Sequence, residues 1–210
     1  PEMPKEQLSL RMLSSMSGIK HSTLRTRNIS AVEKDVFASS LAKLSAAPIY
    51  IDDSARLDAN ALRARARRTA KKAGSLALVI VDYIQLMATA DEVDNATRNL
   101  EVQGISRSIK ALAKELQVPV IAVSQLNRSV DRRSNQRPIL SDLRDSGSIE
   151  QDADVIIFLY REGATKPEEQ STESEAELIV AKQRNGPIGS VKVLFKPETL
   201  SFRTLPRKEN

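Results

Sequence analysis

Apolar side chains recur at helical spacing in four parts of the chain. The first helix is predicted between Pro4 and Gly18, because proline suits a first helical turn and glycine suits a helix end. A second helix begins at Ser30, whose spacing to Glu33 is that of a capping box. The residues expected to form the buried stripes of these two helices are Leu8, Met12, Leu13 and Met16, and then Val32, Val36, Phe37, Leu41 and Leu44.

Two more helices are predicted further along. Asp58 is a candidate N-cap, Leu57 and Leu62 stand at the spacing of a hydrophobic staple, and Gly74 marks the end of this helix. The last helix ends before Pro119. The residues predicted to face the core are Ala59, Leu62, Ala66, Ala70 and Ala73 in the first of these helices, and Ile105, Ile109, Leu112 and Leu116 in the second.

Continuous apolar runs predict strands. Residues 76–81, 118–123 and 153–160 fit strands that are buried on both faces, as in a parallel sheet. A short strand is predicted at residues 48–51. Residues 177–181, 190–195 and 200–204 predict a closing meander, with a turn at Asn185-Gly186-Pro187. The fold class is therefore α/β, with a mainly parallel sheet flanked by helices and an antiparallel C-terminal extension.

Composition narrows the possible functions. There are no cysteines and one histidine, which excludes disulfides, thiolate metal sites and histidine-based zinc sites. Aromatic residues make up 3% of the chain and tryptophan is absent, which excludes a broad base-stacking platform. No apolar run reaches the roughly 20 residues that span a bilayer. The net charge is +5, which favours a polyanionic partner, although cationic residues on solvated helix faces explain it equally well.

Polar residues follow two of the predicted parallel strands. Asp82 comes directly after residues 76–81, and Ser124-Gln125 follows residues 118–123. Because the carboxyl ends of parallel strands share one edge of a sheet, this edge is a candidate phosphate site. Asp82 is a candidate Mg²⁺ ligand, with a simple turn cap as the alternative, and Gln125 is a candidate γ-phosphate sensor. Asp52 and Asp53, after residues 48–51, are expected to have a turn or capping role rather than to bind metal.

Two features expected of a phosphate-hydrolysing site are missing from these strands. Many P-loop ATPases have a glutamate directly after the aspartate, whereas Tyr83 stands there, so a general base has to come from elsewhere. Glu2 is the candidate. The G-x-x-x-x-G-K-[ST] cradle is absent as well.

Five stretches carry a resemblance to a known family. In chain order they are EMPKEQLSLRMLSSMSGI, LVIVDYIQLM, ISRSIKALAKELQVPVIAVSQLNRSVDRR, LSDLRDSGSIEQDADVIIFLYR and AELIVAKQRNGPIGSVKVLFKPETLSF. Together they cover nearly the whole chain. The sequence resembles the C-terminal, RecA-like motor domain of the bacterial replicative DNA helicase, the DnaB family.

The resemblance implies a P-loop NTPase that uses ATP and Mg²⁺ to move 5'-3' on single-stranded DNA and to unwind the duplex at the replication fork. Its implied partners are single-stranded DNA, further copies in a homo-hexamer, primase and a helicase loader. No membrane partner is implied. Its implied location is the bacterial cytoplasm, at the nucleoid and replisome.

The resemblance also assigns roles to single residues. Glu2 matches the glutamate that activates water, Asp82 the Mg²⁺-associated aspartate, and Gln125 the residue that couples the γ-phosphate to the DNA loops. Lys182 and Arg184 match the basic pair that reaches into the neighbouring subunit's nucleotide site. The residues that match the loop following the DNA backbone are Arg144, Asp145 and Gly147.

We expect residues 1–210 to be one partial RecA-like motor domain, with a flexible loop at 161–175 and a polar tail at 205–210. The P-loop unit is expected to precede residue 1, so the isolated chain is expected not to hydrolyse ATP. Two alternatives stay open. One is a recombination ATPase of the RecA/RadA type, and the other is a non-catalytic module for single-stranded DNA binding or assembly.

Overall fold

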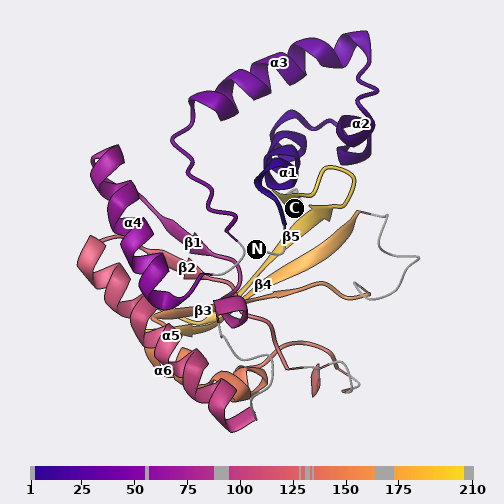
Figure 1. Ribbon diagram of the computed structural model, residues 1–210. Helices are drawn as coiled ribbons and strands as arrows, with labels where there is room; N and C mark the ends of the chain where they lie inside the picture. Colours follow the sequence, from indigo (N-terminus) through magenta and orange to yellow (C-terminus); the bar gives the residue numbers. More distant parts are fainter. Residues whose placement is uncertain are drawn as a thin grey trace. The chain divides into compact units, whose positions relative to one another are not determined.

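The chain is a mixed α/β protein. The computed structural model describes residues 3–54, 57–87, 95–127, 129–130, 133, 135–163 and 173–205. These residues form two compact units. Figure 1 labels their helices and strands. The first unit contains the described residues within 54–157 and residues 180–188, and the second contains residues 3–53 and the described residues within 158–179 and 189–205. None of the described helices combines the length and the apolar character that crossing a bilayer requires.

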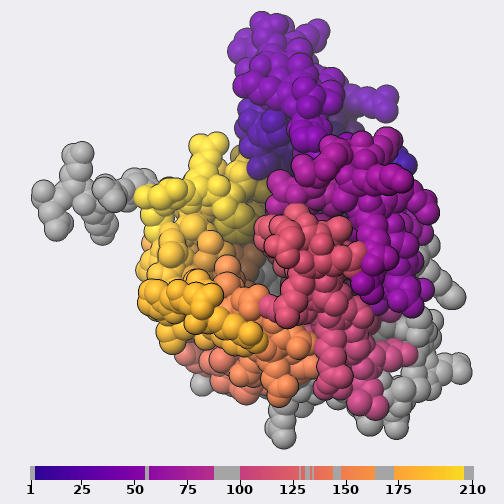
Figure 2. Space-filling model, turned by 90° about the vertical axis from the view of Figure 1, so that its left-hand side faces the viewer, coloured from indigo at the N-terminus to yellow at the C-terminus, as the bar shows by residue number. Residues whose placement is uncertain are grey.

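Two helices form one side of the first unit, α4 (Ala59–Ala73) and α5 (Asn95–Leu116). The predicted N-cap is confirmed, because the Asp58 carboxylate accepts a hydrogen bond of 2.8 Å from the Ala61 N–H. Arg63 and Arg67 of α4 both form ion pairs with Glu115 of α5. The two helices therefore lie against each other on the surface (Figure 2).

A parallel pair of strands packs against these helices. β1 (Val79–Val81) pairs with β2 (Val120–Ala122), and Val81 stands opposite Ala122. After β1 the chain forms a 3₁₀ turn, η1 (Ile84–Met87). The buried residues of the core beside α5 are Val81, Ile84, Met87, Val102, Ile105 and Ile109.

The expectation that these strands are buried on both faces is wrong in the described structure. Ile80 is 61% exposed and Ile121 is 51% exposed, although Val81, the last residue of β1, is buried. Successive strand side chains point to opposite faces. Only one face of this pair packs against the helical core, so the other face stays open.

A short helical segment completes the first unit. The 3₁₀ helix η3 (Leu140–Ser146) leads directly into α6 (Gly147–Asp152), which packs against α5. Ser106 of α5 donates a 2.8 Å hydrogen bond to the Asp152 carboxylate and so ties the end of α6 to α5. The sequence pattern did not predict α6, because it has too few apolar residues to show a helical stripe.

The second unit begins with three helices, α1 (Lys5–Ser17), α2 (His21–Thr26) and α3 (Ala31–Ala46). The predicted end of α1 is confirmed, since Gly18 has a φ of 72°. The capping box of Ser30 and Glu33 is present at the start of α3. The core of these helices consists of Leu13, Ile19 and Leu24, with Leu10, Ile29, Phe37 and Leu44 packed against it.

Two predictions for this unit are wrong. Val32 is 85% exposed, and Val36 and Leu41 are exposed as well, so only Phe37 and Leu44 of the predicted α3 stripe pack on the core. The apolar face of α3 is longer than the part of it that packs against α1, so the remaining apolar side chains of α3 stay exposed. Residues 48–51 form no strand, because no described strand pairs with them.

Asp53 has the capping role expected of it, but for a distant helix. Its carboxylate accepts a 3.2 Å hydrogen bond from the N–H of Lys5, the first residue of α1, and its other oxygen lies 3.9 Å from the Lys5 ammonium. A carboxylate at a helix N-terminus is stabilised by the helix dipole. The position of Asp53 therefore follows from α1 and requires no metal.

Four further strands form the second sheet, β3 (Val155–Tyr160), β4 (Ser174–Gln183), β5 (Gly189–Lys196) and β6 (Ser201–Thr204), in that order. The predicted closing meander is confirmed, and β5 pairs antiparallel with β6. The sheet differs from the mainly parallel one expected, because β3 joins β4 rather than β2. In the predicted flexible loop at 161–175, residues 164–172 lie outside the described part of the chain, and β4 already begins at residue 174. In the predicted tail, residues 206–210 also lie outside the described part.

Candidate functional site

Asp82 and Gln125 lie at the same end of the parallel pair. Asp82 is the residue after β1, and Gln125 follows β2 by three residues. The ladder continues past both strands, with Val123 N–H donating to Val81 O at 2.9 Å and Ile84 N–H donating to Val123 O at 3.0 Å. Because main-chain bonds hold the residues on both sides of Asp82, its position is fixed by the ladder.

Both side chains are exposed and available. Within the part of the chain that the structure describes, the Asp82 carboxylate has no hydrogen bond or ion pair, and neither has the Gln125 side-chain amide. A turn-capping aspartate would accept a nearby N–H. The capping alternative for Asp82 is therefore not supported by these contacts.

Gln85 joins the ends of the two strands and was not predicted from the sequence. Its amide nitrogen donates to Ser124 Oγ at 2.8 Å and to Gln125 O at 3.3 Å, and its amide oxygen accepts from Gln125 N–H at 3.3 Å. The one available signal was a polar residue inside the apolar run Ile84-Gln85-Leu86-Met87. Gln85 positions the main chain that carries Gln125.

The donor set around Asp82 fits a magnesium ion that is shared with a phosphate. Mg²⁺ is typically held by one or two carboxylates together with substrate phosphates, rather than by a cage of protein ligands. Within the described residues, no group of three or more His, Asp or Glu side chains could hold a metal. A single available carboxylate at a strand end meets the first requirement and leaves the remaining ligands to a nucleotide. Glu2, the candidate base, lies outside the described residues.

Lys182 lies near the end of β4 and Arg184 directly follows this strand, and both side chains bind the end of α6. The Lys182 ammonium donates to the Glu150 carbonyl, and Arg184 Nη2 donates to the Gln151 carbonyl at 2.6 Å. Cations at a helix C-terminus satisfy its free carbonyls and complement the helix dipole. The predicted basic pair is thus brought together with a helix that precedes it by some 30 residues.

Asp154 and Lys110 complete this cluster and were also not predicted from the sequence. The Asp154 carboxylate lies 3.6 Å from Arg184 Nε and forms an ion pair with Lys110 of α5. The Lys110 ammonium, and secondarily the charges of Arg184 and Lys182, hold the pKa of Asp154 below its ordinary value. No sequence signal marks these two residues, because one stands on a helix and the other before a strand.

The predicted DNA-contacting residues lie at the other end of α6. Arg144 and Asp145 belong to η3, and Gly147 is the first residue of α6. Their main chain runs continuously into the helix whose last carbonyls bind Lys182 and Arg184. One short helix therefore connects the two predicted functional segments.

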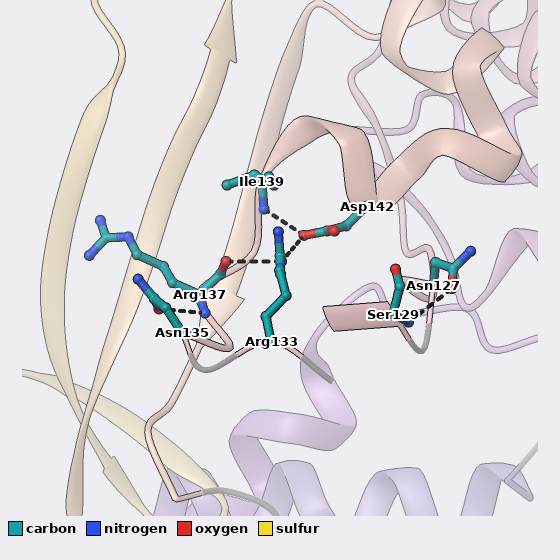
Figure 3. A network of polar contacts seen from close by, with 7 residues as sticks. All are labelled: Asn127, Ser129, Arg133, Asn135, Arg137, Ile139 and Asp142. Atoms are coloured by element: carbon teal, nitrogen blue, oxygen red, sulfur yellow. Dashed lines mark hydrogen bonds and ion pairs between the residues drawn. The ribbon is translucent and has the colours of Figure 1, made fainter. Parts of the chain in front are cut away.

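A second polar network stabilises the segment that precedes η3 (Figure 3). The Asp142 carboxylate is 5% exposed, and it accepts from Arg133 Nη2 at 2.6 Å and from Ile139 N–H at 2.8 Å. Arg133 Nη2 also donates to Arg137 O. Arg133, Asn135, Arg137 and Ile139 line an open hollow of about 380 Å³. Arg133 is thus committed to holding this segment together.

The sequence matches the DnaB-like helicase C terminal domain family over residues 1–204. The chain belongs to this family. It is 46% identical, over all of its length, to the replicative DNA helicase DnaB of Pasteurella multocida (strain Pm70), and 42% identical, over 99% of its length, to that of Geobacillus stearothermophilus. It spans 44% and 45% of the lengths of these two relatives.

Solved structures of related proteins have the same fold. A DnaB-like replicative helicase, described with its interactions with primase, superposes with a TM-score of 0.87 at 36% identity, covering 98% of this chain and 49% of that one. A second structure, described as an ATPase domain, gives the same TM-score and identity and covers 98% of this chain and 72% of that one. The family resemblance read from the sequence is therefore confirmed.

Proposed function

We propose that this DnaB-family chain works as a RecA-like motor module of a replicative helicase, which couples ATP hydrolysis to 5'-3' movement on single-stranded DNA. The observation that carries the proposal is the pair of available polar side chains, Asp82 and Gln125, at one edge of a parallel sheet. Ligands bind at that edge in open α/β folds. Bound ATP with Mg²⁺ supplies the phosphoryl group whose transfer releases the energy for movement.

Each residue near this edge has a defined task in the proposal. Asp82 holds Mg²⁺ through its carboxylate. Gln125 contacts the γ-phosphate with its side-chain amide, and Gln85 keeps the main chain of Gln125 in place. Glu2 acts as the base that takes a proton from the attacking water. The P-loop that would cradle the phosphates is not part of this sequence, so we expect the isolated chain to show no ATPase activity.

Arg184 and Lys182 act on nucleotide held by a neighbouring copy. A cationic side chain supplied in trans is typically worth about 10³–10⁵ in the rate of phosphoryl transfer. This arrangement requires a ring of copies, for which we propose a homo-hexamer. The contacts of both residues with α6 support a link between this basic pair and the DNA segment, since Arg144, Asp145 and Gly147 lie at the start of that helix.

Further partners follow from the relatives. One solved relative is described with primase, and we propose primase and a helicase loader as partners of the complete helicase. Family membership favours the helicase over a recombination ATPase. A non-catalytic role in DNA binding or assembly stays as the second candidate, because the chain lacks a P-loop of its own.

The trans role of Arg184 is tested by Arg184→Ala in the full-length helicase. We expect the ATPase rate to fall by about 10³-fold or more, while nucleotide affinity changes little, because the arginine serves a neighbour's transition state. Lys192→Ala is the matched control, since Lys192 lies on the same hairpin and pairs with Glu175. Loss of nucleotide binding in a folded Arg184→Ala protein would contradict the trans role.

A further inference from the structure

The guanidinium of Arg184 is oriented from one side by a single short segment. The Arg184 main-chain N–H donates to Asp154 O at 2.9 Å, which fixes the start of the side chain. Nε lies 3.6 Å from Asp154 Oδ1, and Nη2 donates to Gln151 O at 2.6 Å. In the described part of the chain, Nη1 has no partner.

We propose that Asp154 is a positioning residue for Arg184, holding the Nε edge of its guanidinium so that the Nη1 edge is presented to a phosphate. This inference rests on the proposed function, in which Arg184 acts on nucleotide bound by a neighbouring copy. An arginine has five N–H donors in a rigid plane, so holding one edge sets the direction of the others.

Lys110 makes this support rigid. Its ammonium pairs with Asp154 Oδ2 while Oδ1 faces Arg184, so the carboxylate is held between two cations. The Asp154 side chain is itself 56% exposed, and without Lys110 it would be free to rotate into solvent. Because Lys110 stands on α5, the orientation of Arg184 is tied to the helix that packs against the core.

The charges in the cluster also suit a polyphosphate. Lys110, Lys182 and Arg184 place three positive charges around the Asp154 carboxylate, while the nearby Asp152 carboxylate is held by Ser106 of α5. The pKa of Asp154 lies below its ordinary value, chiefly because of Lys110, so the carboxylate stays ionised at neutral pH. Clustered cationic side chains attract phosphate oxygens, and the carboxylate between them keeps the arginine in one orientation.

A purely structural ion pair is the competing explanation, and exposure weighs against it. The side chains of Asp154 and Arg184 are 56% and 48% exposed, and ion pairs as exposed as this contribute little to folding. The contribution of the Asp154–Arg184 pair is to orient the guanidinium, because a misplacement of about 1 Å near a reacting group can reduce a rate by about 10²-fold.

The test uses the full-length, assembled helicase and measures the ATPase rate against ATP concentration. We expect Asp154→Asn to reduce kcat by about 10- to 100-fold, because a neutral amide cannot form an ion pair with the Arg184 guanidinium. KM and Tm should stay near those of the wild type. Asp154→Glu should recover kcat to within about threefold of the wild type, since its carboxylate still reaches Nε. Glu175→Gln is the matched control, being a similarly exposed carboxylate paired with a lysine.

A double variant separates positioning from other roles. On an Arg184→Ala background, Asp154→Asn should cause no further loss of kcat, because Asp154 acts through Arg184. Lys110→Met should cause a smaller loss that also disappears on that background. Losses that multiply, failure of Asp154→Glu to restore the rate, or a normal Asp154→Asn enzyme would each overturn the proposal.

The same series distinguishes this inference from the proposed function. If Arg184→Ala itself keeps its ATPase activity, the trans role of Arg184 fails and the positioning role fails with it. If Arg184→Ala is inactive and Asp154→Asn is normal, only the positioning role of Asp154 is refuted.

Discussion

Ile84 is predicted to be the residue on which the position of the Asp82 edge depends most strongly. It is 1% exposed, it belongs to the core beside α5, and its N–H bonds to Val123 O at 3.0 Å. Replacing Ile84 with alanine removes three carbon atoms, which corresponds to about 2.4 kcal/mol of lost transfer free energy at about 0.8 kcal/mol each. The cavity that remains adds to this, so we expect a total loss of about 4 kcal/mol in the free energy of unfolding.

Leu86 in the same 3₁₀ turn is the matched control. It is 46% exposed, so Leu86→Ala should cost only about 1 kcal/mol. Urea denaturation followed by circular dichroism measures both losses, and in a protein of this size a loss of about 4 kcal/mol corresponds to a fall in Tm of about 8 to 16 °C. If Ile84→Ala cost no more than Leu86→Ala, the packing of η1 against α5 would not support the main-chain ladder that holds Asp82.

Three further predictions concern the charged groups. Asp142→Asn should lower the free energy of unfolding by about 2 kcal/mol, because it breaks the ion pair with Arg133. The loss is smaller than for a fully buried pair, since the Arg133 side chain is 34% exposed, and an unchanged urea midpoint would contradict the prediction. Arg144→Ala should weaken single-stranded DNA binding about equally for all sequences, and the slope of log binding constant against log salt concentration should fall by roughly one unit. Filter binding at several salt concentrations measures both effects, and a base-specific loss would argue against a phosphate contact. The lowered pKa of Asp154 implies a stabilisation that is present above its ordinary value of 3.8 and is lost as the pH falls through the folded-state pKa. Because the Asp154 side chain is 56% exposed, the urea midpoint of the wild type should exceed that of Asp154→Asn only slightly at neutral pH, and this small difference should vanish in acid; a large difference at neutral pH would contradict this.

Local signals in the sequence were sufficient for most helices. The N-caps at Ser30 and Asp58 and the stop at Gly18 were confirmed, because a cap depends on residues within one turn of the chain. The short helices α2 and α6 were missed, since so few residues cannot establish a periodic stripe.

Burial was less well predicted than secondary structure. Ile80 and Val32 belong to patterns that predict a buried face, yet both are exposed in the described structure. An apolar pattern identifies the face of a helix or strand that gains stability from burial. Whether another helix or strand packs on that face depends on how the other elements of the fold are arranged. This is why the order of residues along β1 could not reveal that only one of its faces is packed.

The amino-acid sequence alone was enough to locate the candidate nucleotide edge and to indicate the family. Asp82 and Gln125 could be placed because each follows an apolar strand, and parallel strands end at a common edge. The groups that support them became known only from the folded chain. Gln85 joins two strand ends, and Asp154 with Lys110 holds Arg184, through contacts between residues that are 30 to 44 positions apart along the chain. Such contacts leave no local pattern, because they depend on how separate elements pack, and packing is a property of the whole fold.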